Sequence, residues 1–127
     1  MQGTIRFVAG EGSTEDATER HRAACAAMDR YIPHVVAWRC AQPGAPLVLT
    51  LPEVLSAREV VQRAARARVE VAAAHDPAAP DRALEIHYAH LADTEIEEGL
   101  RRLGRCLVRD LTLAMRSTAS EPSFFGL

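Results

Sequence analysis

The stretch Ala83–Leu107, ALEIHYAHLADTEIEEGLRRLGRCL, decides how this chain folds. Its first part, Ala83–Ala89, alternates between apolar and polar side chains, which is typical of a strand with one buried face. Thr94 and Glu97 then form a capping box, a Thr at a helix start with a Glu three residues later. Apolar residues recur at helical spacing from there on: Ile96, Leu100, Leu103, Leu107, Leu111 and Ala114. The stretch therefore predicts a strand followed by a long amphipathic helix.

The sequence before this stretch divides into short elements separated by Gly and Pro. The expected elements are a strand at 4–9, a helix from Ser13 or Thr14 to Ile32, strands at 34–39 and 47–51, a helix opened by a capping box at Ser56 and Glu59, and a strand from Arg68 or Val69 to Ala74. This order predicts an α+β fold with one open, mostly antiparallel sheet and helices packed on one face. We expect a single domain over residues 1–116 and a loose tail over 117–127, whose Phe124, Phe125 and Leu127 could dock on an apolar surface.

Composition restricts the class of protein. The chain has 127 residues, of which 48% are hydrophobic and 25% charged, as in an ordinary globular domain. Its net charge of −2 gives no reason to expect a nucleic acid or an anionic membrane as partner. The N-terminus lacks the basic start and apolar run of a signal peptide. Three widely spaced cysteines predict reduced thiols in the cytoplasm and no zinc or other metal site.

The stretch Glu95–Leu103, EIEEGLRRL, resembles the last helix of fold-type-I PLP-dependent aminotransferases, and most of all that of their MocR-like group. The segments ERHRAACAAMDRYIP, LVLTLP and SAREVVQRAARARVEV are similar to the preceding elements of the C-terminal small domain in that family. The likeness covers about residues 17–113. It implies an aminotransferase small domain standing apart from the family's PLP-binding large domain and winged-helix domain.

Several departures from the family concern its chemistry. All fifteen basic residues are Arg, so no Lys amine is present to form the Schiff base that holds PLP. Aminotransferases often clamp the substrate carboxylate with an Arg in the last strand, where this sequence has Glu85. Arg68 stands where the family usually has a Gly. The resemblance therefore implies the fold without the aminotransferase activity, and no cofactor is expected.

Alternation along the strands predicts a candidate site on the sheet face that turns away from the helices. That face is expected to be an Ala and Val floor carrying four polar side chains, Arg39, Glu70, Glu85 and His87. His87 beside Glu85 or Glu70 could act as an acid/base pair, with Arg39 holding an anion. A solvated face with ordinary cross-strand ion pairs explains the same residues.

Three functions remain open at this stage. The first is a non-catalytic interaction or accessory module that forms a homodimer or a subunit of a split PLP enzyme. The second is a stand-alone, PLP-independent acid/base enzyme, of cyclase or isomerase type, in a small-molecule biosynthetic pathway. The third is a sensor that binds a small-molecule ligand, for which Glu85 disfavours amino acids. The missing Lys favours the first.

Overall fold

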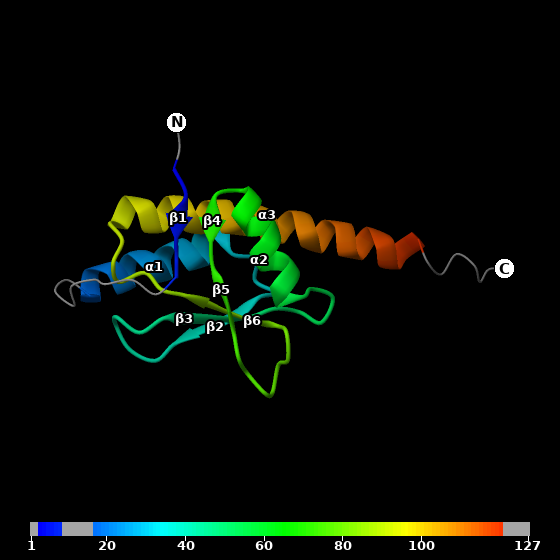
Figure 1. Ribbon diagram of the computed structural model, residues 1–127, viewed down its shortest axis with the longest axis horizontal. Helices are drawn as coiled ribbons and strands as arrows, with labels where there is room; N and C mark the ends of the chain where they lie inside the picture. Colours follow the sequence, from blue (N-terminus) through cyan, green and yellow to red (C-terminus); the bar gives the residue numbers. More distant parts are fainter. Residues whose placement is uncertain (1–2, 9–16, 121–127) are drawn as a thin grey trace.

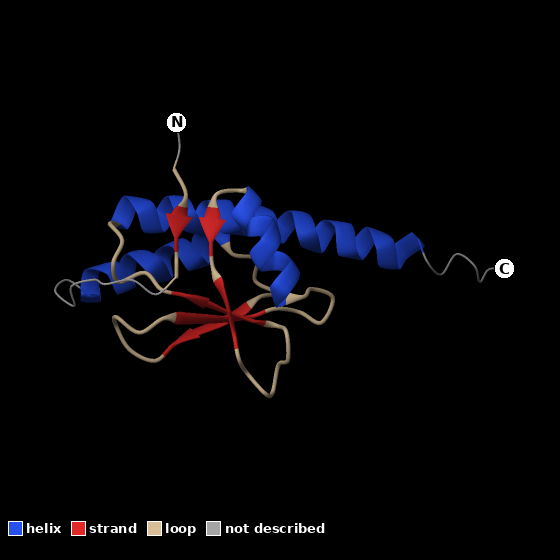
Figure 2. Cartoon of the chain, in the orientation of Figure 1, coloured by secondary structure: helices blue, strands red, loops and turns tan. Residues whose placement is uncertain are grey.

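The computed structural model describes residues 3–8 and 17–120, with side chains as far as Arg116. Figures 1 and 2 show the helices on one side of a twisted sheet, with α3 beside α1 and projecting past the rest of the fold. The elements are β1 (Ile5–Arg6), α1 (Ala17–Tyr31), β2 (Ala37–Cys40), β3 (Leu47–Thr50), α2 (Ala57–Arg66), β4 (Val69–Glu70), β5 (Ala72–Ala74), β6 (Ala83–Ile86) and α3 (Asp93–Ser120). The predicted fold class is confirmed.

The arrangement of the strands differs from the predicted single sheet. Strands β2, β3, β6 and β5 form an antiparallel sheet in that order, while β1 and β4 form a separate parallel pair. The strand expected up to Ala74 is divided at Val71, because the N-terminal segment enters between it and the end of β6. There the Phe7 amide donates to the Glu70 carbonyl at 2.7 Å, and the His87 amide donates to the Phe7 carbonyl at 2.9 Å. A segment more than sixty residues away in sequence thus splits the strand.

The predicted inward faces of the strands are confirmed. Leu47 and Leu49 of β3 and Leu84 and Ile86 of β6 are fully buried against the helices. The register pairs Leu49 with Leu84 and Leu47 with Ile86, so the same side chains meet across the sheet. Burying four such side chains stabilises the fold by roughly 1.5–3 kcal/mol each. The alternation therefore fixes which face remains outside.

Helix α3 packs on both α1 and β1 through two glycines. A Cβ atom at Gly99 would lie 2.5 Å from the Phe7 ring, and one at Gly104 would collide with the backbone carbonyl oxygen of Tyr31. The predicted apolar stripe of α3 is fully buried from Ile96 to Leu107, and its last members, Leu111 and Ala114, are partly buried. The glycines allow a close approach that any other residue would prevent.

The two predicted capping boxes have different outcomes. Ser56 is the N-cap of α2, and its hydroxyl accepts from the Glu59 amide at 3.3 Å. The box at Thr94 is wrong, because α3 already begins at Asp93 and the Ala92 amide donates to the Glu95 carboxylate at 3.0 Å. Ala92 offers no side-chain oxygen, so only half of a capping box forms. The Glu at position 97 makes tertiary contacts instead.

Observed boundaries are shorter than those predicted for the strands. Val35 precedes β2, and the region after Ile86 is not strand. The predicted cap at Ser13 or Thr14 lies outside the described residues. Helix α3 covers residues 117–120 of the expected tail, and 121–127 lie outside the described part. No helix of the described residues is long and apolar enough to cross a membrane.

We predict that Gly104→Ala destabilises the fold despite the higher helix propensity of Ala. The added methyl group has no space beside the Tyr31 carbonyl, and forced overpacking typically costs about 1–3 kcal/mol. Urea unfolding followed by circular dichroism measures the change. Gly3→Ala is the matched control, since a Cβ at that position meets nothing within 4 Å. Equal stability of the Gly104 variant and the wild type would contradict the packing described.

Candidate functional site

One row of paired residues crosses the outer face of the four-stranded sheet. Arg39 of β2 pairs with Val48 of β3, Val48 with Glu85 of β6, and Glu85 with Ala72 of β5. Directly paired residues point to the same side of a sheet, so these four side chains share the face away from the helices. The floor of small and β-branched side chains that the sequence predicted is present here. Ala72 and Val48 are partly exposed on it.

The structure brings Glu85 and His87 together. The His87 Nε2 atom lies 3.2 Å from a Glu85 carboxylate oxygen, within hydrogen-bonding distance. The two side chains are 27% and 38% exposed, so water and a small molecule can both reach the pair. A carboxylate beside an imidazole can orient the ring and hold a proton between them. This contact is the chemically most useful feature of the outer face.

The other two predicted site residues are placed differently. Glu70 belongs to the small parallel sheet, where Arg6 Nε contacts its carboxylate at 3.2 Å. Arg39 makes no ion pair with any residue in the described ranges. It stands two strands from Glu85, about 10 Å at the usual strand spacing. The candidate site is therefore a Glu–His pair with a separate Arg on the same face.

A second polar cluster, which the sequence did not reveal, joins α1 to the β2–β3 turn. The Gly44 amide donates to the Tyr88 hydroxyl at 3.0 Å, and that hydroxyl lies 3.1 Å from His21 Nδ1. His21 Nε2 lies 3.5 Å from the Cys25 sulfur, and Cys40 Sγ lies 3.5 Å from Nδ1. Because Tyr88 accepts from Gly44, its own proton is available to His21. The one local signal was the spacing of His21 and Cys25, one helical turn apart.

This cluster, named the Tyr88 cluster here, is suited to holding elements together. Burial raises the pKa of Tyr88 to about 12. Burial also raises the pKa of Cys25, with the neighbouring Cys40 as a further cause. A thiol with a raised pKa is a poor nucleophile at neutral pH. Among the described residues no group of three His, Cys, Asp or Glu side chains is arranged to hold a metal ion.

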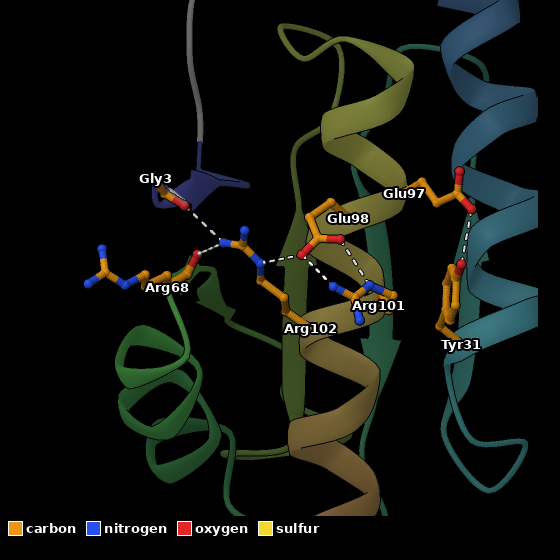
Figure 3. A network of polar contacts seen from close by, with 7 residues as sticks. All are labelled: Gly3, Tyr31, Arg68, Glu97, Glu98, Arg101 and Arg102. Atoms are coloured by element: carbon orange, nitrogen blue, oxygen red, sulfur yellow. Dashed lines mark hydrogen bonds and ion pairs between the residues drawn. The ribbon is translucent and has the colours of Figure 1, made fainter. Parts of the chain in front are cut away.

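The charged residues of EIEEGLRRL form an ion-pair network on α3 (Figure 3). The Glu98 carboxylate accepts from Arg101 at 2.7 and 2.9 Å and from Arg102 at 2.8 Å. These hydrogen bonds, that of Arg101 first, lower the pKa of Glu98 to about 2. Arg102 also donates to the carbonyl oxygens of Gly3 and Arg68, at 2.9 and 3.1 Å. The motif therefore attaches α3 to the segments before β1 and β4.

Comparison with known proteins finds similar folds among solved structures. No protein-family model and no curated protein matches the sequence. Among solved structures, the chain is similar to LysN, an alpha-aminoadipate aminotransferase from Thermus thermophilus, with 31% identity and a TM-score of 0.69 over 78% of this chain. The chain has the fold of an aminotransferase small domain. It covers 26% of the LysN chain, so about three quarters of that protein has no equivalent here.

Two further structures show the same fold at lower identity. They are the multiple substrate aminotransferase of Thermococcus profundus, at 22% identity, and the kynurenine aminotransferase of Pyrococcus horikoshii, at 20%. Each has a TM-score of 0.68, and this chain covers 25% of each. The matched portion is thus consistently about one quarter of a full aminotransferase.

The residues present do not fit a complete PLP site. PLP enzymes bind the cofactor as a Schiff base on a Lys amine, and all fifteen basic residues of this chain are Arg. A guanidinium does not supply that amine at physiological pH. The last strand also presents Glu85 outward, and a carboxylate repels an anionic substrate group. No step that passes through PLP can be assigned to these residues.

We predict that Tyr88→Phe weakens the fold at neutral pH and removes part of its alkaline sensitivity. The variant loses the hydrogen bonds to Gly44 and His21, each worth about 1 kcal/mol. Burial raises the pKa of Tyr88 from its ordinary 10.0 to about 12, so its contribution to stability is complete below pH 10 and falls as the pH rises toward 12. Urea unfolding at several pH values should show the stability difference between the two proteins shrinking above pH 10. A constant difference would contradict this account.

Proposed function

We propose that this chain is a non-catalytic accessory module derived from an aminotransferase small domain, and that it works by packing its outer sheet face on another polypeptide. The observation that carries the proposal is the combination of a sheet face that none of the described helices covers with a fold equal to one quarter of an aminotransferase. The preferred partner is a separate chain with a PLP-binding body, which would make the pair a split enzyme. The EIEEGLRRL motif supports an origin in the MocR-like group.

The composition of the face supports this role. The row across the sheet has apolar side chains at Val48 and Ala72. It carries a positive charge at Arg39 and a negative charge at Glu85. Partly apolar faces with a polar rim are typical of protein interfaces. The row also suits a two-fold homodimer, in which Arg39 of each copy would meet Glu85 of the other. Either partner would cover the floor of the sheet.

A specific contact supports a second function, a stand-alone acid/base enzyme that does not use PLP. The Glu85–His87 pair, at 3.2 Å, has the composition of a general acid/base couple and is open to solvent. Arg39 on the same face would attract an anionic substrate such as a keto acid. In this alternative the outer face binds a small molecule, either in a single chain or in the cavity between two copies.

The accessory role predicts that a charge placed in the row disrupts assembly. Light scattering on the pure protein distinguishes a monomer of 13.9 kDa from a dimer of twice that mass. Capture with tagged protein from a native extract, followed by mass spectrometry and PLP absorbance, detects a PLP-binding partner. We expect the wild type to form either a homodimer or a complex with a PLP-binding chain. Val48→Asp should form neither.

The same substitution in an exposed loop serves as the control. Val54 is 56% exposed and lies outside the sheet, so Val54→Asp should assemble as the wild type does. Circular dichroism verifies that both variants are folded. A wild-type monomer that captures no PLP-binding chain would rule out the accessory role, as would equal assembly of both variants.

The enzymatic alternative predicts proton exchange at carbons next to a carbonyl group. Incubation with a panel of keto acids in heavy water, followed by NMR, measures this exchange without knowledge of the substrate. His87→Ala should lower the rate at least a hundredfold, the usual contribution of a general acid or base. His75→Ala, in the exposed loop, is the control and should have no effect. Absence of wild-type exchange, or equal rates in the wild type and His87→Ala, would remove this alternative.

A further inference from the structure

Nearly half of the arginines gather around one groove between α2 and α3. Two adjoining hollows of about 390 and 360 Å³ lie there and share Ala67, Cys106 and Arg109. The arginines that line them are Arg63, Arg66 and Arg68 on the α2 side and Arg101, Arg102, Arg105 and Arg109 on α3. We call these seven residues and the two hollows the arginine groove. Figure 3 shows part of this region, where the Arg102 side chain lies between the backbone carbonyl of Arg68 and Glu98, with Arg101 on the far side of Glu98.

The groove is strongly positive on a chain that is acidic overall. Its seven arginines face two carboxylates, Glu98 and Asp110, which leaves an excess of five positive charges. The whole chain carries a net charge of −2, so the remainder of the protein is distinctly acidic. Such a separation of charge attracts an anionic partner to one place on the surface.

Some of these arginines are already held by carboxylates. Glu98 binds Arg101 and Arg102, as described above. Arg63 contacts Glu59 at 3.3 Å and Asp110 at 3.4 Å. Asp110 is only 5% exposed, and one of its oxygens has no hydrogen-bond partner in the described structure, so its charge is balanced mainly by Arg63. These pairs form the fixed wall of the groove.

Three arginines of the groove remain available. Arg66, Arg105 and Arg109 are exposed and make no hydrogen bond or ion pair with any residue in the described ranges. Arg105 and Arg109 are one helical turn apart on α3, about 6 Å between their Cβ atoms. Arg66 lies at the end of α2 and lines the same hollow as Arg109. Each guanidinium can bind a carboxylate through two parallel hydrogen bonds.

The shape of the groove indicates the kind of ligand. Its α3 wall runs from Glu98 to Leu113, about 22 Å at the rise of an α-helix. An extended peptide of roughly six or seven residues has the same length. Ala67, Cys106 and Leu113 give the groove apolar sides against which a peptide backbone can lie. None of the described residues lining it is aromatic, so bases of a single-stranded nucleic acid would have no side chain to stack on.

From these observations we infer that the arginine groove binds an extended acidic segment of a protein partner, with Asp or Glu side chains seated on Arg66, Arg105 and Arg109. This inference does not depend on the outer sheet face, which lies on the other side of the fold. It adds to the chain a second interaction surface, which would bind its partner through opposite charge.

Fluorescence anisotropy with a labelled hexaglutamate peptide tests the inference on the full chain at about 50 mM salt, where screening is weak. We expect saturable binding that weakens as the salt concentration rises. Arg105→Gln with Arg109→Gln should weaken it about tenfold, the effect of losing two exposed charge pairs. Both side chains point into solvent, so the double variant should fold normally, as circular dichroism will show.

A second double variant controls for net charge. Arg22→Gln with Arg58→Gln removes the same charge outside the groove and should leave the affinity unchanged. An equal loss in both double variants would show attraction without a site and overturn the inference. Absence of wild-type binding would also overturn it. Tighter binding of an oligothymidylate of equal charge would assign the groove to nucleic acid instead.

Discussion

The close approach of α3 to its neighbours at two glycines is the constraint on which the rest of this structure depends. Gly104 brings the helix against the backbone of α1, and Gly99 admits the ring of Phe7. Phe7, fully buried, in turn connects β4 to the end of β6 through its backbone. A side chain at either glycine would move α3 outward and open the core beneath the sheet. The position of the outer sheet face follows from this packing, because α1, α2 and α3 all lie on the other side of the sheet.

The motif that first suggested an aminotransferase has an architectural explanation here. Its carboxylates and guanidiniums connect α3 to α1 and to the segments before β1 and β4, as the contact of Glu97 with the Tyr31 hydroxyl at 3.0 Å illustrates. Such a network depends on tertiary geometry and does not require the enzyme's reaction. Its presence is therefore consistent with a chain that has the fold of an aminotransferase small domain and lacks the Lys amine on which PLP enzymes hold the cofactor. Fold and chemistry are separable, and the motif reports on the fold.

The sequence was sufficient for features that depend on local periodicity. Alternation identified Leu84 and Ile86 as buried, and helical spacing identified the inner face of α3. It failed where distant segments decide the outcome. The division of the fourth predicted strand depends on Phe7, and the Tyr88 cluster joins residues from three separate regions. Glu70 was one of two candidate partners for His87, but it contacts Arg6, which the pairing of β1 with β4 places next to it. The arginine groove was hidden as well, because net charge averages over the whole surface.

The short strand β1 has a consequence for the integrity of the sheet. Ile5 of this strand and Phe7 just after it form backbone hydrogen bonds with Arg68, Glu70 and His87, whose groups would otherwise lack these partners. A shortened chain that begins after Val8 would expose both of these edges together with the apolar groove left by the Phe7 ring. Unpaired strand edges next to apolar surface recruit further strands, and the expected result is aggregation. The segment from Ile5 to Phe7 thus closes two strand edges that would otherwise favour aggregation.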